Sequence, residues 1–107
     1  MITRLRREQA GLEVNSWQRV IDIADPGVEG LAIMCSHSHL PVPKVGYEIR
    51  GRDSGVIAEL ELAWPDHRVG IAIDVADAGV AESEGWTIWK VVEALDEFET
   101  FKTSGLV

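Results

Sequence analysis

The sequence predicts an α+β domain in which a mixed four-stranded sheet contains a three-strand antiparallel meander. Short helices flank the sheet, and an amphipathic helix closes the chain at its C-terminus. Apolar residues recur at helical spacing before residue 36, alternate with a period of two between Lys44 and Val75, and return to helical spacing after Val92. The chain has 107 residues, 46% of them hydrophobic, which is enough for one core. We therefore expect one domain over 1–107, with an N-terminal helical segment at 1–36.

Two short helices are expected first. Asn15-Ser16 precedes apolar residues at spacings of three and four, as a helix cap does. Asp25-Pro26 offers a second cap with a proline in the first turn, and apolar residues follow it at helical spacing. Residues 36–43 include two prolines at alternate positions, which force an extended path. This stretch is predicted to be a connecting loop.

Three strands are expected next. Residues 45–49 alternate in polarity, and the glycine-rich segment 51–55 predicts a hairpin turn. Successive side chains of a strand point to opposite faces, so residues 56–64 should place one apolar set on one face. That set consists of Val56, Ala58, Leu60, Leu62 and Trp64. A second turn at 65–68 leads into a third alternating strand over 69–75, which completes the meander.

The end of the chain is expected to form a helical turn, a strand and a helix. Residues 78–84 permit one or two helical turns, and Gly85 is suited to end them in a left-handed conformation. The aromatic and β-branched run 86–91 predicts the fourth strand. Apolar residues then recur every three positions from Val92 to Phe101, which predicts the closing helix. The predicted core comprises Trp64, Ile71, Ile73, Ile88, Leu95 and Phe98.

The charge balance disfavours binding to bare nucleic acid. Ten Lys and Arg residues face eighteen Asp and Glu residues, a formal net charge of -8, and such a field repels phosphate backbones. We expect weak or no direct binding of duplex DNA, although Arg4, Arg6 and Arg7 make one end of the chain basic. Seven acids stand between Asp77 and Glu99 against one lysine, which indicates either a solvated surface or an acidic interaction face.

An interaction face would bind a protein partner with a basic surface. Trp86 and Trp89 have opposite strand parity, so one of them should face outward and serve as an apolar anchor. The acidic rim would comprise Glu93, Asp96 and Glu97.

Membrane insertion and export are not expected. The longest apolar runs fall far short of the roughly 18 residues that a membrane span needs. The basic start of the chain is followed by Glu8 and Gln9 rather than by the apolar stretch of a signal peptide. The single cysteine, Cys35, excludes an internal disulfide and fits a cytoplasmic location. Its spacing to His37 and His39 matches no common zinc site. Cys35 lies on the apolar side of a predicted helix, so we expect it to be buried as a small hydrophobic residue.

Four carboxylates are expected on the polar face of the meander. Strand geometry places them on three neighbouring strands, and cross-strand neighbours lie about 4.5–5.5 Å apart at Cβ. They are Glu48, Glu59, Glu61 and Asp74. Two interpretations remain open: an ordinary solvated face, or a site for a hard cation such as Mg²⁺, which takes oxygen ligands.

The order of elements and four sequence tracts resemble a known nuclease core. The tracts are Val45-Gly46-Tyr47-Glu48-Ile49, the run from Gly55 to Pro65, Val69-Gly70-Ile71-Ala72-Ile73-Asp74 and Gly85-Trp86-Thr87-Ile88-Trp89-Lys90. Together, over residues 44–91, they resemble the PD-(D/E)XK nuclease superfamily in its very-short-patch-repair endonuclease-like branch. Similar cores occur at the C-terminus of large bacterial DEAD-box or SNF2-like helicases, often in defence loci, without the catalytic acids. The resemblance implies a nuclease-like core over about 44–103.

The resemblance also implies that the catalytic motif is degenerate. Glu61 would replace the metal-binding Asp, and Asp74 would stand where the motif has its lysine. Ala72 falls where the family has its essential Glu, and a methyl group cannot coordinate a metal or activate water. Without the lysine, the cation that stabilises the developing phosphorane charge is absent as well.

We therefore expect a noncatalytic nuclease-like accessory or protein-interaction domain, without a cofactor, in a bacterial nucleic-acid-processing or defence system. Its partner would be a helicase or another nucleic-acid-processing protein. Two alternatives stay open. The first is a Mg²⁺-dependent DNA endonuclease that uses Glu48, Glu59, Glu61 and Asp74, with the metal on Glu61 and Asp74. The second is a small acidic inhibitor whose carboxylates imitate DNA phosphates.

Overall fold

The computed structural model describes residues 16–106, so the basic group Arg4, Arg6 and Arg7 lies outside the described residues. Five α-helices, two 3₁₀ helices and four strands make up this part of the chain and confirm the α+β class. In chain order they are α2 (Trp17–Ile23), η1 (Pro26–Val28), α3 (Glu29–His37), β1 (Lys44–Arg50), β2 (Val56–Trp64), η2 (Pro65–His67), β3 (Val69–Ile71), α4 (Val75–Ser83), β4 (Thr87–Trp89), α5 (Val91–Asp96) and α6 (Phe98–Thr103).

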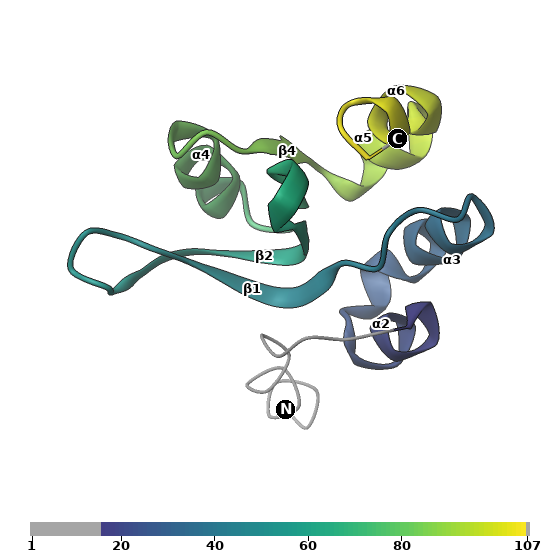
Figure 1. Ribbon diagram of the computed structural model, residues 1–107, viewed down its shortest axis with the longest axis horizontal. Helices are drawn as coiled ribbons and strands as arrows, with labels where there is room; N and C mark the ends of the chain where they lie inside the picture. The colour runs from purple at the N-terminus through teal and green to yellow at the C-terminus, as the bar shows by residue number, and fades with distance from the viewer. Residues whose placement is uncertain (1–15, 107) are drawn as a thin grey trace.

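The sheet is mixed, as the sequence predicts. Its strand order is β1-β2-β3-β4. The pairs β1–β2 and β2–β3 are antiparallel, and β3 and β4 are parallel. A parallel neighbour needs a crossover connection, and α4 supplies it between β3 and β4. The β1–β2 hairpin extends away from the helices to an isolated tip (Figure 1).

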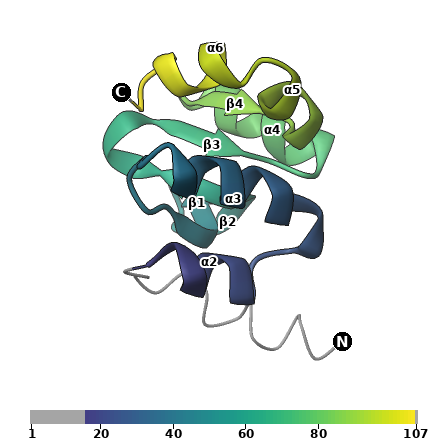
Figure 2. The same cartoon turned by 90° about the vertical axis from the view of Figure 1, so that its right-hand side faces the viewer.

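Helices cover both faces of the sheet, and each face has its own apolar cluster. The larger cluster joins the sheet to α2, α3, α5 and α6 and includes Leu31, Leu62 and Phe101. The smaller cluster lies under α4 and contains Leu60 and Ala81. Figure 2 shows α3 in front of the strands and α4 behind them. The sheet is therefore the middle layer of the fold.

The predicted helix starts are confirmed by their capping hydrogen bonds. Ser16 Oγ accepts the backbone N–H of Arg19 at 3.1 Å, and α2 begins at the next residue. Asp25 Oδ1 accepts the N–H of Gly27 at 2.8 Å and so starts η1, which runs directly into α3. Each bond satisfies a donor that the first helical turn leaves without an intrahelical partner.

The predicted single apolar face of β2 is wrong. Ala58 and Leu60 pack under α4, whereas Leu62 and Trp64 pack against the helices of the other face. The change of face occurs opposite Gly46, which has a positive φ of 65° and lies between the pairs Val45↔Leu62 and Tyr47↔Leu60. A left-handed residue turns the side chains on its two sides relative to each other, and glycine adopts that conformation without steric cost.

The third strand is shorter than the alternation predicts. It ends at Ile71, and Asp74 and Val75 already belong to the start of α4. Ile73, expected in the core, is 53% exposed, while Trp64 and Ile71 are buried as predicted. The error has a local cause: an Asp side chain that can cap a helix competes with continuation of the strand.

The closing helix is also broken. Instead of one amphipathic helix there are α5 and α6, separated by Glu97 with φ −122° and ψ 49°. The break turns the apolar stripe, so that Ala94 and Phe101 are buried while Val92 and Leu95 are exposed. The predicted core position of Leu95 is therefore wrong, and Ile88 and Phe98 are only partly buried. Every helix between residues 16 and 106 is too short to cross a membrane.

Candidate functional site

The four candidate carboxylates do not form one group. Glu48 and Glu59 are direct cross-strand partners on β1 and β2. Glu48 is exposed, and its Oε1 accepts a hydrogen bond from Arg50 Nη2 at 2.7 Å. Glu59 is half-buried. Glu61 lies two residues further along β2, whereas Asp74 lies at the start of α4.

Glu61 has a structural contact. It is buried, with 3% of the residue exposed, and its Oε2 accepts the backbone N–H of Asp25 at 2.7 Å. The bond ties the middle of β2 to the junction between α2 and η1, 36 residues earlier in the chain. A carboxylate that accepts a backbone N–H in a buried setting satisfies a donor that would otherwise be costly to bury.

Asp74 and Ala72 lie where β3 gives way to α4. Asp74 is the N-cap of α4, and its Oδ1 accepts the N–H groups of Ala76 and Asp77 at 2.7 and 3.4 Å. Ala72, which stands where the resemblance to the nuclease core leads one to expect a Glu, is buried in the cluster beneath α4. The carboxylate of Asp74 is thus used for capping, and the neighbouring methyl group for packing.

No three His, Cys, Asp or Glu side chains within residues 16–106 lie close enough to hold one metal ion. Glu61 and Asp74, the two proposed metal ligands, are instead held by different helix starts. Each is engaged with backbone donors, and a cation needs free carboxylate oxygens.

The two candidate tryptophans lie on opposite faces of the sheet, as their parity predicts, but neither projects outward. Trp86 is buried in the cluster beneath α4, where its ring lies 5.6 Å from that of Tyr47. Trp89 packs on the other face, with its ring 5.6 Å from Phe101. Because helices cover both faces, Trp86 is buried and Trp89 is partly buried, and the role of either as an anchor stays a prediction. The acids Glu93, Asp96 and Glu97 are exposed.

A group of exposed aliphatic residues was not predicted. Ile73, Val75, Val92 and Leu95 follow the last residues of β3 and β4 and are exposed. The available signal was that acids stand beside each of them in the sequence, as in Val92-Glu93 and Leu95-Asp96. Their spacing instead suited a core position, but α5 packs through Val91 and Ala94, which leaves Val92 and Leu95 exposed.

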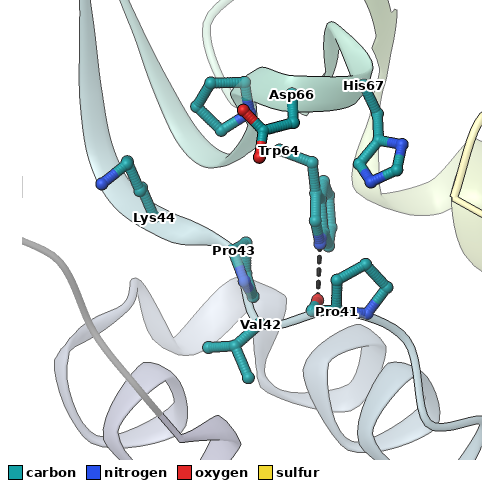
Figure 3. A pocket seen from close by; sticks show the side chains of 8 residues that line it. Pro41, Val42, Pro43, Lys44, Trp64, Asp66 and His67 are labelled. Carbon is teal, nitrogen blue, oxygen red and sulfur yellow. Dashed lines mark hydrogen bonds between the residues drawn. The ribbon is translucent and has the colours of Figure 1, made fainter.

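Two cavities lie beside β1. The first, of about 330 Å³, is formed by the loop before β1 and by the segment 64–67. Trp64 Nε1 donates to the carbonyl of Pro41 at 2.6 Å across it, while Lys44 extends away from the tryptophan (Figure 3). Its charged groups therefore do not converge on one point.

The second cavity, of about 430 Å³, lies on the other side of Pro65 and is lined by Tyr47 and Trp86. Its two guanidinium groups are already engaged. Arg50 pairs with Glu48, and Arg68 Nη1 donates to the carbonyl of Glu84 at 3.1 Å. Charges of both signs thus offset each other in this cavity.

Cys35 is buried in the main cluster, as the sequence predicts. Burial raises the pKa of its thiol from 9.0 to about 12, because the apolar surroundings disfavour the thiolate. The nucleophilic form is therefore suppressed at neutral pH.

We expect Cys35 to resist a thiol reagent at pH 8 in the folded protein and to react when denaturant is added. Because the pKa is raised in the folded state, the folded protein holds this proton more tightly above pH 9. The free energy of unfolding should therefore fall as the pH rises from about 9 towards 12. Rapid labelling without denaturant, followed by absorbance, would contradict the buried position.

The protein is thus an α+β domain whose sheet is covered by helices on both faces. Its four candidate carboxylates do not converge on one site, and its acidic surface carries exposed aliphatic residues. Its sequence is 33% identical over 100 residues to the Zorya protein ZorE of Escherichia coli. The match covers 94% of this chain but only 26% of that protein, so the chain spans about a quarter of its relative. No family model and no solved structure matches the chain.

Proposed function

We propose that the chain is a noncatalytic nuclease-like interaction domain that works with other proteins in a bacterial defence system of the Zorya type. Its similarity to the Zorya protein ZorE over nearly the whole chain supports the defence setting. The order α3, three antiparallel strands, α4, β4 and α5 is the order on which the resemblance to the nuclease core rests.

The use of the carboxylates carries the noncatalytic part of the proposal. Glu61 holds the N–H of Asp25, Asp74 caps α4, and Ala72 is packed in the core. Metal-dependent cleavage of a phosphodiester needs carboxylates that converge on a cation and a group that activates water. Here the corresponding positions maintain the fold, and a fold can outlast its chemistry.

The acidic surface supports binding to a protein rather than to bare DNA. Seven acids and a single lysine lie between residues 72 and 97. Such a field favours encounter with a basic protein surface and opposes approach to phosphates. A helicase or another nucleic-acid-processing protein, whose own surface must be basic to hold its substrate, fits this description.

Phage plating on the native host, with all its defence genes in place, tests the proposal. Deletion of the gene for this chain should raise the plating efficiency of a sensitive phage to that on a host without the system. A double variant, Glu59→Gln with Asp74→Ser, removes one candidate catalytic carboxylate and one candidate metal ligand. It keeps the helix cap, since Ser also caps. Protection should persist in this variant.

Each outcome of the plating assay has a separate meaning. Unchanged protection after deletion would contradict a role in defence. Loss of protection in the double variant, with normal folding by circular dichroism, would instead favour the Mg²⁺-dependent nuclease.

A further inference from the structure

The surface at the carboxyl ends of β3 and β4 is built like an interface. These strands are parallel, Ile71 pairs with Trp89, and the N–H of Ala72 donates to the carbonyl of Trp89 at 3.2 Å. The segments that follow β3 and β4 therefore leave the sheet at the same end. They carry the aliphatic residues of what we call the carboxyl-end surface: Ile73, Val75, Val92 and Leu95, exposed by 53%, 70%, 61% and 37%.

Acidic side chains accompany these aliphatic residues. Asp77 belongs to the first turn of α4, and Glu93 and Asp96 alternate with Val92 and Leu95 along α5. An apolar centre with a charged rim is the usual anatomy of a protein interface. Single exposed apolar residues scattered over a surface need no explanation, but several that follow the carboxyl ends of two adjacent strands do.

The charge of the rim limits what can bind there. A nucleic acid would bring phosphates against carboxylates, which is unfavourable. A second copy related by two-fold symmetry would place the same acidic rim against itself, and like charges across an interface cost free energy. A different protein, with apolar side chains surrounded by Lys and Arg, is complementary both to the centre and to the rim.

We infer that the carboxyl-end surface binds a separate protein partner through an aliphatic contact enclosed by lysine and arginine side chains. The inference rests on the proposed function and specifies where its partner binds. It replaces the tryptophan anchor predicted from the sequence with aliphatic residues, and it retains Glu93 and Asp96 from the predicted rim.

Site-specific photo-crosslinking in the native host tests this surface. A photoreactive phenylalanine derivative is introduced at position 75 or 92 of the full chain. Positions 33 and 57 are matched controls, because Ile33 and Ile57 are also aliphatic and each is 39% exposed. We expect one protein adduct at 75 and 92, absent at the controls, with the crosslinked partner peptide next to Lys or Arg residues.

Charge reversal then tests the rim. Asp77→Lys with Asp96→Lys should reduce the yield of the adduct at position 92 at least about tenfold, because rim charges govern encounter. The control variant, Asp22→Lys with Glu82→Lys, changes the net charge by the same amount. Asp22 lies on α2 and Glu82 near the C-terminal end of α4. Charges this distant are screened, so the yield of the adduct at position 92 should stay within about twofold.

Four outcomes would overturn the inference: equal adducts at all four positions, an adduct of twice the chain's mass, an adduct with nucleic acid, and no intermolecular adduct. If protection against phage still depends on the gene in any of these cases, the proposed function stands and only this surface is rejected. If protection does not depend on the gene, the proposed function fails, whatever the adducts show.

Discussion

Replacing Phe101 by alanine should lower the free energy of unfolding by about 3–5 kcal/mol, the usual cost of removing a buried aromatic ring. Phe101 is fully buried, and its ring lies 5.9 Å from Trp64, 5.6 Å from Trp89 and 6.0 Å from Phe98. It thus joins α6 to the ends of β2 and β4. Urea unfolding followed by tryptophan fluorescence measures the change.

Val92→Ala is the matched control for this prediction. It shortens an apolar side chain on the preceding helix that is 61% exposed, and its effect should stay within about 0.5 kcal/mol. A loss below about 1 kcal/mol for Phe101→Ala would mean that the ring is not at the centre of a packed core.

Replacing Glu61 by alanine should cost about 2–3 kcal/mol, because the N–H of Asp25 would lose its acceptor inside the protein. Glu48→Ala, at an exposed position on the neighbouring strand, should change stability by less than about 0.5 kcal/mol. The measurement is again urea unfolding. Unchanged stability for Glu61→Ala would contradict its structural role and would restore it as a candidate metal ligand.

Local signals in the sequence accounted for most of the fold. The caps at Ser16 and Asp25, the hairpin turn and the left-handed Gly85 are all observed, the last with a φ of 95°. Each of these depends on a few neighbouring residues and on a specific hydrogen bond or backbone conformation. Local patterns of this kind are visible without knowledge of the tertiary contacts.

The errors occurred where a single residue changed the course of the chain. Gly46 rotated β1, so that the simple alternation on β2 no longer predicted which face a side chain covers. Asp74 ended the third strand by capping α4, and Glu97 split the last helix. Several conformations compete at such positions, and tertiary packing decides among them.

The site was less accessible to prediction than the fold. Strand parity placed Trp86 and Trp89 on opposite faces correctly, but it could not show that helices cover both faces. The same reasoning grouped Asp74 with the three glutamates of β1 and β2, because it took Asp74 for a strand residue rather than the N-cap of α4. Exposure of the acids on α5, in contrast, followed directly from their charge.

Incubation of the purified protein with supercoiled plasmid and Mg²⁺ or Mn²⁺ tests most directly the proposal that this domain is noncatalytic. The account predicts that the plasmid remains supercoiled at every protein concentration, since Glu61 and Asp74 are engaged in maintaining the fold and Ala72 cannot bind a cation. Metal-dependent nicking that disappears in the Glu59→Gln, Asp74→Ser double variant would contradict it and would identify the protein as an endonuclease.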